Sequence, residues 1–202
     1  MRVGFILNNK IKIAVFASGS GSNFQSIVDS GHSAYEVVLL VCDRPQAKAI
    51  DRAKKAGIDS FVFQPKQYPN KQVFEREIVQ HLKEKQVGFI ALAGYMRLIG
   101  PTLLTEYEGK IINIHPSLLP AFPGKDAVGQ ALAKQVKVTG VTVHFIDEGM
   151  DTGPIIAQEP IYVHNKDTKE TLQQKIHQIE HQLYPEVIQD LCLTIGKETI
   201  KK

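Results

Sequence analysis

The sequence predicts an α/β fold, in which a mostly parallel central sheet carries helices on both faces. Short apolar runs of high β-propensity alternate along the chain with amphipathic helical patterns, which is the order of strand–helix–strand crossover units. A glycine-serine turn joins the first apolar run to the first helical pattern. The chain has 202 residues, of which 43% are hydrophobic and 22% charged, as expected for one globular domain with a sizeable core.

The first part of the chain predicts two strand–helix units. The apolar run Ile11–Ala17 predicts the first strand, and a helical pattern over Ser22–Ser30 follows the glycine-serine turn. The run Tyr35–Cys42 predicts the second strand. A helix over Ala47–Ala56 follows, and Gly57 is placed to end that helix in a left-handed cap.

The middle of the chain adds three strands and two helices. Ser60–Phe63 predicts a short strand before a loop with two prolines. The helix predicted over Gln72–Lys85 gathers its apolar residues on one face, at the three- and four-residue spacing of a helix. Gly88–Ala91 and Lys110–Ile114 predict two more buried strands, and Pro101 between them predicts the first turn of a short helix.

The last part of the chain begins with a stiff, proline-rich loop. A helix over Asp126–Lys134 follows this loop. Two strands are expected to pair over Val138–Ile146 and Ile155–Val163. The final long helix is predicted to begin near Thr168, and Pro185 is expected to interrupt it.

Composition excludes several classes of protein. The two cysteines, Cys42 and Cys192, are too few for a disulfide scaffold or a four-thiolate zinc site, and they fit a reducing cytoplasm. No apolar run approaches the ~20 residues of a membrane span, and the first residues lack a signal-peptide cleavage site. A net charge of +3 is too small to indicate nucleic-acid binding but suits a small anionic ligand. We expect one cytoplasmic domain over residues 11–195, an N-terminal extension over residues 1–10 and a polar tail over residues 196–202.

The turn Ser18–Asn23 has glycines at its second and fourth positions, directly before a helix. Glycines let a ligand approach the backbone closely, and the unpaired N–H groups of a helix start favour an anion, so we expect a phosphate here. A tight turn capped by a serine is the alternative. The dinucleotide fingerprint needs a third glycine where Phe24 stands, so a mononucleotide or sugar phosphate fits better. Asp43, which follows the second strand where a ribose-binding acid would lie, keeps nucleotide binding open.

A polar cluster follows the fifth predicted strand. Asn113 and His115 alternate with isoleucines, so both side chains project to the same side near the strand's carboxyl end, where open α/β sheets bind ligands. An amide and an imidazole can donate hydrogen bonds to an oxygen that gains charge; capping of a proline turn is the alternative. If Asp151 reaches His115, its charge stabilises the protonated imidazole. His144 faces the same cleft or lies satisfied in the core.

The sequence offers no clear signal for a covalent or a metal-dependent mechanism. It has no Gly-x-Ser-x-Gly elbow and no cysteine with an obvious activating partner, so we expect direct group transfer. His177, Glu180 and His181 match the inverted zinc motif H-x-x-E-H on a helix. A catalytic zinc needs a third protein ligand, and none is clearly placed. We therefore expect no metal.

Several motifs together resemble the phosphoribosylglycinamide formyltransferases of purine synthesis, a folate-dependent family. The stretches SGSGSNFQ, LAGYMRLIG, IINIHPSLLPAFPG, VTVHFIDEGMDTGP and IEHQLYP occur in the family's order within residues 11–190. The NIHPSLLP and DTGP elements are highly specific together, and the SGSGSN loop narrows the resemblance to the nucleotide enzyme. The resemblance implies a Rossmann-like formyltransferase fold. It also implies formyl transfer from the co-substrate 10-formyltetrahydrofolate to the amine of glycinamide ribonucleotide.

By the same resemblance, Asn113 and His115 stabilise the tetrahedral oxyanion, His115 donates a proton, and Asp151 supports the histidine and helps route a proton through water. The implied ribotide site comprises Ser20, Gly21, Ser22, Asn23, His177 and Glu180. The implied formyl-folate site comprises Lys71, Met96, Arg97, Leu98, Ile99, Asn113, Asp147, Glu148, Gly149, Met150 and Asp151. The implied partners are these two small molecules, with no nucleic acid and no membrane, and we expect a monomer or a homodimer.

Two positions depart from the family's pattern. Lys71 stands where members often carry an arginine, which keeps the charge but loses the planar fork. Asp126 stands where many members have histidine, which alters polar support beside the site. The N-terminal extension over residues 1–10 is also unlike the family, whose first strand begins almost at once.

Three other functions share part of these motifs. Methionyl-tRNA formyltransferase has the same Asn-x-His-Pro-Ser-Leu-Leu-Pro core, but it continues with an arginine-glycine run and adds a C-terminal nucleic-acid domain. This chain has Ala121–Gly124 at that point, and we expect no such domain. Formyltetrahydrofolate hydrolase adds an N-terminal regulatory domain that we do not expect here. A phosphate-binding module without activity is the third alternative, and only an assay separates it from an enzyme.

Overall fold

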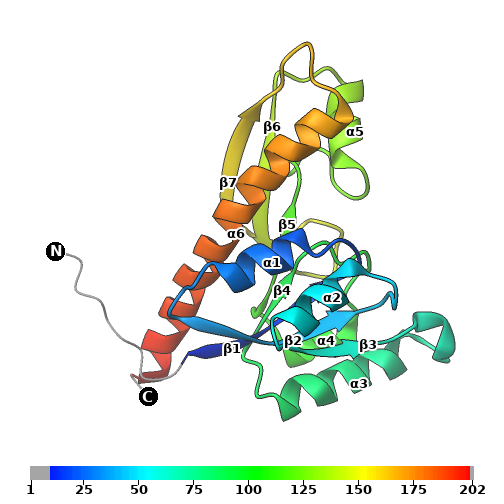
Figure 1. Ribbon diagram of the computed structural model, residues 1–202, viewed down its shortest axis with the longest axis vertical. Helices are drawn as coiled ribbons and strands as arrows, with labels where there is room; N and C mark the ends of the chain where they lie inside the picture. Colours follow the sequence, from blue (N-terminus) through cyan, green and yellow to red (C-terminus); the bar gives the residue numbers. More distant parts are fainter. Residues whose placement is uncertain (1–9, 201–202) are drawn as a thin grey trace.

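The centre of the protein is a seven-stranded sheet, seen in a computed structural model that describes residues 10–200 (Figure 1). Residues 1–9 of the expected extension and residues 201–202 of the expected tail lie outside the described residues. The strands are β1 (Ile11–Ala17), β2 (Tyr35–Cys42), β3 (Asp59–Val62), β4 (Phe89–Leu92), β5 (Ile111–His115), β6 (Val138–Phe145) and β7 (Ile155–Tyr162). Their order is β3-β2-β1-β4-β5-β6-β7. The first five pair in parallel, and β6 and β7 extend the sheet antiparallel, so the predicted fold class and the predicted pairing of the last two strands are confirmed.

Helices cover both faces of the sheet, and each face buries its own apolar core. One core packs α1 (Ser22–Asp29), α2 (Lys48–Lys55), α5 (Ala127–Ala133) and α6 (Lys169–Ile200) against the sheet. The other core packs α3 (Lys71–Glu84) and α4 (Pro101–Glu106) against the opposite face. A short 3-10 helix, η1 (Pro65–Gln67), occupies the loop for which the sequence predicts only two prolines.

Helix α6 continues through Pro185, so the interruption expected there is wrong. A proline inside a helix costs about 3 kcal/mol, because it removes one backbone hydrogen bond and crowds the preceding turn. Tyr184 and Ile188 beside it are fully buried, and burial of each large apolar side chain contributes about 1.5–3 kcal/mol. The Tyr184 hydroxyl also lies 2.9 Å from the Leu92 carbonyl oxygen and 3.2 Å from that of Ile112. The free energy gained by packing these residues in the core therefore outweighs the local cost of Pro185.

Among the helices described in residues 10–200, α6 included, none is long and apolar enough to cross a membrane.

The strand order reverses at β1, since the chain leads from β1 to β2 on one side while β4 pairs with β1 on the other. Ligands of open α/β sheets bind outside the carboxyl ends of the strands at such a reversal. The segments that follow β1, β4 and β5 begin at Ser18, Ala93 and Pro116, and they share this end of the sheet. The fold thus brings the predicted site segments to one edge.

Candidate active site

A cavity of about 680 Å³ opens at this edge. Its wall contains most of the predicted site residues, which are Ser20, Gly21, Ser22, Asn23, Met96, Arg97, Leu98, Ile99, Asn113, His115, Asp147, Gly149, Met150, Asp151, His177 and Glu180. Two predicted residues do not line it. Lys71 begins α3, with its Nζ 4.0 Å from the buried carboxylate of Glu75, and Glu148 is exposed on the loop after β6. The wall also includes Gly124 and Gln173, which the sequence does not single out.

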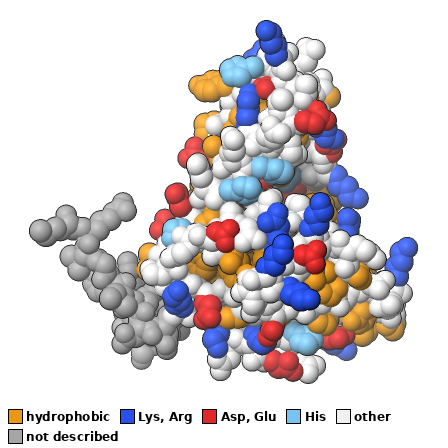
Figure 2. Space-filling view, viewed as in Figure 1, with side chains coloured by type: hydrophobic (Ala, Val, Ile, Leu, Met, Phe, Trp, Pro, Cys, Tyr) orange, Lys and Arg blue, Asp and Glu red, His pale blue; other side chains and the backbone are white. Residues whose placement is uncertain are grey.

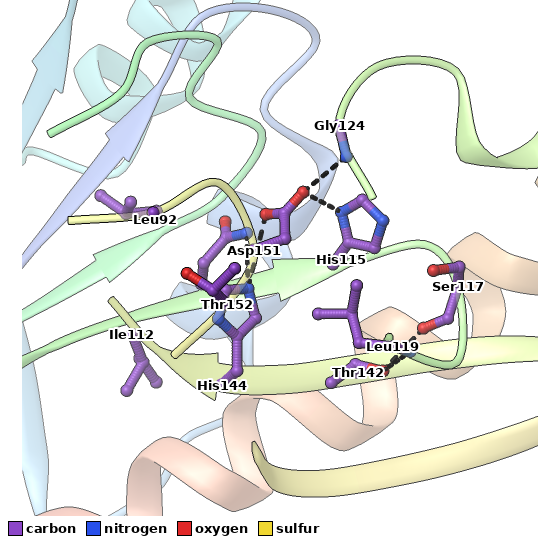
Figure 3. Close-up of polar contacts among 12 residues, drawn as sticks. Leu92, Ile112, His115, Ser117, Leu119, Gly124, Thr142, His144, Asp151 and Thr152 are labelled. Carbon is purple, nitrogen blue, oxygen red and sulfur yellow. Dashed lines mark hydrogen bonds and ion pairs between the residues drawn. The ribbon is translucent and has the colours of Figure 1, made fainter. Parts of the chain in front are cut away.

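His115 and Asp151 meet in this wall, as expected from the sequence (Figure 3). Nδ1 of His115 lies 3.4 Å from Oδ2 of Asp151, and the two side chains are only 5% and 13% exposed. Nε2 of the same ring lies 2.9 Å from the carbonyl oxygen of Phe122. Both neighbours are acceptors, so only a doubly protonated imidazolium donates in both directions. The arrangement therefore suits a buried cationic donor beside a carboxylate.

Asp151 is held in place by its backbone and by one strong hydrogen bond. Its φ of 58° is left-handed, a conformation that aspartate tolerates better than most residues. Its Oδ2 accepts a hydrogen bond of 2.7 Å from the backbone N–H of Gly124, and its Oδ1 lies 3.7 Å from Nε2 of His144. The carboxylate thus ties the loop after β6 to the proline-rich loop after β5.

His144 lies fully buried on β6, where it is the register partner of Asn113 on β5. Figure 3 shows its ring close to Asp151. Its Nδ1 is 2.8 Å from the carbonyl oxygen of Phe145, so this nitrogen carries a hydrogen. Burial lowers the pKa of His144, which favours the neutral ring and leaves a lone pair on Nε2. That lone pair can accept from Nδ2 of Asn113 at 3.2 Å. His144 therefore orients the Asn113 amide and leaves its second N–H available to the cavity.

The glycine-rich turn starts α1 in a form that only glycine can adopt. Gly21 is the residue before the helix, with a φ of 71° and no side-chain cap, so the turn is not capped by a serine. A Cβ on Gly21 would lie 2.7 Å from Cα of Ala49, which no side chain tolerates. Arg52 of α2 donates from Nε to the carbonyl oxygen of Ser20 at 2.9 Å. Lys and Arg side chains gather over α2 on this face (Figure 2), so the helix start and its surroundings favour an anion.

Helix α6 packs beside α1 and contributes His177 and Glu180 to the cavity wall. Nδ2 of Asn23 donates to Oε2 of Glu180 at 3.0 Å, and burial raises the pKa of Glu180 to about 7. Burial lowers the pKa of His177, whose Nε2 lies 2.9 Å from the amide nitrogen of Gln173. Oδ1 of Asn23 is buried and has no protein partner within the described residues. This half of the cavity wall therefore contains a buried amide oxygen whose hydrogen-bonding capacity is unused among the described residues.

The raised pKa of Glu180 predicts a pH-dependent stability. The folded chain keeps this proton up to about pH 7, whereas the unfolded carboxyl releases it near 4.5. The unfolded state binds fewer protons in that window, so the free energy of unfolding should fall by about 3 kcal/mol as the pH rises through it. Denaturant titrations of wild type and Glu180→Gln at pH 4.5 and 7.5 measure how much of the pH dependence of the free energy of unfolding comes from Glu180. Parallel pH curves for the two proteins would contradict it.

The half of the cavity farther from α1 exposes large apolar side chains. Met96 and Leu98 follow β4 and are 57% and 53% exposed, and Met150, on the loop after β6, is 52% exposed. All three line the cavity. Exposed apolar side chains gathered in one place mark a binding surface, and methionines adapt their shape to a ligand. This half suits a partly apolar ring system.

Two alternatives from the sequence find no support in the site. Asp43 is not part of the cavity wall, and its two carboxylate oxygens already accept from Ser18 and Arg97, so it does not serve as a ribose acceptor. Nε2 of His181 is buried and has no hydrogen-bond partner among residues 10–200, and its ring stacks on that of His177 with the centroids 6.0 Å apart. Within the described part of the chain, no three His, Cys, Asp or Glu side chains converge where they could hold a metal ion.

Comparison with known proteins assigns the family. Residues 11–188 match the formyl transferase family model. A phosphoribosylglycinamide formyltransferase of Bacillus subtilis is 60% identical over 89% of this chain and 94% of its own length. Crystal structures of glycinamide ribonucleotide transformylase 1 from Geobacillus kaustophilus (59% identity, TM-score 0.89, 91% of this chain and 100% of that chain) and of phosphoribosylglycinamide formyltransferase from Bacillus halodurans (55% identity, TM-score 0.87, 89% and 94%) share the fold. The chain therefore belongs to the formyl transferase family, in its phosphoribosylglycinamide formyltransferase branch.

Proposed function

We propose that this protein transfers the formyl group of 10-formyltetrahydrofolate to the amine of glycinamide ribonucleotide, by direct attack and without an acyl-enzyme. The observation that carries the proposal is the His115–Asp151 pair beside Asn113. The same cavity is lined in its other half by the first residues of helix α1. Donors for a developing oxyanion thus lie next to a site for a phosphate. Family membership supports the same reaction, because the Bacillus subtilis relative is named for it.

The two substrates divide the cavity between them. The ribotide phosphate binds the N–H groups at the start of α1, around Gly21, with His177 of the neighbouring helix α6 in the same cavity wall. Glu180 and the unpartnered Oδ1 of Asn23 accept from the sugar and amide of the same ligand. The formyl-folate lies against Met96–Ile99 and the loop after β6, where the exposed apolar side chains receive its ring. The formyl carbon and the amine then meet beside Asn113 and His115.

The reaction forms one carbon–nitrogen bond and breaks another. The ribotide amine attacks the formyl carbon, and the carbonyl oxygen gains negative charge in the tetrahedral intermediate. The N–H of Asn113 that His144 does not use donates to this oxygen, and the His115 imidazolium joins it by exchanging the Phe122 carbonyl oxygen for the oxyanion at Nε2. Asp151 stabilises the imidazolium and, through water, carries the proton from the attacking amine to N10 of the leaving tetrahydrofolate. No covalent bond to the protein is needed.

An assay with competing acceptors tests the proposal. The purified chain is mixed with 10-formyltetrahydrofolate and, separately, glycinamide ribonucleotide, methionyl-tRNA or water, and deformylation is followed by absorbance. We expect turnover with the ribotide alone. Equal rates in water would indicate a hydrolase, turnover with the tRNA would indicate the related transferase, and absence of turnover with every acceptor would leave a phosphate-binding module.

Asn23→Ala is expected to weaken ribotide binding more than folate binding. The change removes the 3.0 Å bond to Glu180 and the buried acceptor Oδ1. The KM for the ribotide should rise about tenfold, equivalent to about 1.4 kcal/mol, while the KM for formyl-folate stays within about twofold. Asn165→Ala, at an exposed position outside the cavity wall, is the matched control. If Asn23→Ala raised the KM values of both substrates by the same factor, the assignment of Asn23 to the ribotide site would be wrong.

A further inference from the structure

A buried carboxylate, that of Asp43 at the end of β2, connects the two halves of the cavity wall from behind. Its Oδ1 accepts from Oγ of Ser18 at 2.6 Å, and its Oδ2 accepts from Nε of Arg97 at 2.7 Å. Oγ of Ser18 in turn accepts from the backbone N–H of Met96 at 2.9 Å. Ser18 leads directly into the glycine-rich turn, and Met96 and Arg97 belong to the opposite half of the wall.

Because Asp43 is buried, its carboxylate depends on these contacts to compensate for the loss of water. Its side chain is 3% exposed, whereas the Arg97 side chain is 39% exposed and reaches the cavity. A buried carboxylate is tolerated when both oxygens are paired, and charge-assisted hydrogen bonds are roughly twice as strong as neutral ones. One oxygen of Asp43 pairs with the charged Arg97 and the other accepts from the Ser18 hydroxyl. Asp43 therefore fixes the direction of the Arg97 side chain although it does not line the cavity.

The segment that Asp43 holds has left the sheet. Pairing of β4 with β1 ends at Leu92, and two backbone bonds extend it, from Ala93 to Phe16 at 2.8 Å and from Ser18 to Gly94 at 3.1 Å. Beyond Gly94 the chain turns away and exposes Met96 and Leu98 to the cavity. The contacts of Met96 and Arg97 with Ser18 and Asp43 thus continue the attachment where strand pairing stops.

We propose that Asp43 is a positioning residue for the formyl donor: through Arg97 and Ser18 it fixes the wall segment Tyr95–Ile99 against the glycine-rich turn. The inference rests on the proposed function, which places formyl-folate on this segment. It assigns a role to a residue outside the cavity wall, and it predicts a defect specific to one substrate.

Asp43→Asn tests the role, because the amide keeps the volume and removes the charge that holds Arg97. We expect the KM for 10-formyltetrahydrofolate to rise about tenfold, with kcat and the ribotide KM within about twofold of wild type. Ser18→Ala keeps the ion pair of Asp43 with Arg97 and removes the two hydrogen bonds of the Ser18 hydroxyl, to Asp43 and from the Met96 N–H, so a smaller increase is expected. Asp51→Asn, an exposed aspartate on α2, is the matched control.

Titration with folic acid, which has no formyl group to transfer, measures the same defect without turnover. Weaker folic acid binding in Asp43→Asn with unchanged ribotide binding supports the positioning role. A merely structural role would lower the folded fraction and the apparent kcat while both KM values stayed unchanged, and this result would overturn the inference. Wild type without formyl transfer would instead refute the proposed function, because the inference concerns only the difference between wild type and variant.

Discussion

Replacement of His115 by alanine is expected to lower kcat by about 10²–10³-fold, equivalent to about 2.7–4 kcal/mol, which is the usual loss for one oxyanion donor. The ring is 5% exposed and lies between the Asp151 carboxylate and the Phe122 carbonyl oxygen. Alanine removes the imidazole donor from the reaction centre, while Oδ2 of Asp151 keeps its hydrogen bond from the Gly124 N–H. Ribotide affinity should remain nearly intact, because the phosphate site that we propose is at the start of α1, on another part of the cavity wall.

Single-turnover rates and ribotide titrations measure the two parts of this prediction separately. His164→Ala changes an exposed histidine between β7 and α6, and it should behave as wild type. Circular dichroism shows whether the His115 variant folds. A folded His115→Ala protein with wild-type turnover would remove His115 from the mechanism.

Most of the fold is predictable because local patterns and tertiary packing agree. The strands Ile11–Ala17 and Tyr35–Cys42 have the predicted bounds, since their apolar runs end at turn residues. Gly57 has the predicted left-handed φ, at 69°. Pro185 is the exception, because its local preference is opposed by the buried Tyr184, whose contacts to two strands no sequence pattern reveals.

The site is predictable where alternation along one strand determines it. Asn113 and His115 share a side of β5 because side chains alternate along a strand. Contacts between distant segments are harder. Asp151 reaches His115 only because β6 and β7 extend the sheet antiparallel. Lys71 lies beside the buried carboxylate of Glu75 instead of in the cavity wall. That carboxylate is itself fixed in place, because it accepts a hydrogen bond from the N–H of Gly100 before α4. Partner choice of this kind depends on tertiary geometry and has no local signature.

Asp151→Asn is expected to lower kcat by roughly 10²–10⁴-fold, the range for loss of positioned acid–base catalysis. Asparagine has nearly the same volume, tolerates the left-handed φ of 58° and can still accept from the Gly124 N–H, so the loop should keep its shape. The negative charge 3.4 Å from the His115 ring is lost, however, and the imidazolium then lacks its counter-ion. The proton relay that we propose, from the ribotide amine to the leaving folate, is lost with it.

The matched control for this substitution is Asp190→Asn, an exposed aspartate on α6 that should leave turnover unchanged. Titrations with the ribotide and with folic acid should give affinities within about twofold of wild type for Asp151→Asn, since the change removes charge and little volume. A fall in kcat with preserved affinities places Asp151 in the transition state. Loss of both affinities with little change in kcat would instead assign the carboxylate to loop architecture, through its bond to Gly124, and the shared role of Asp151 and His115 would be wrong.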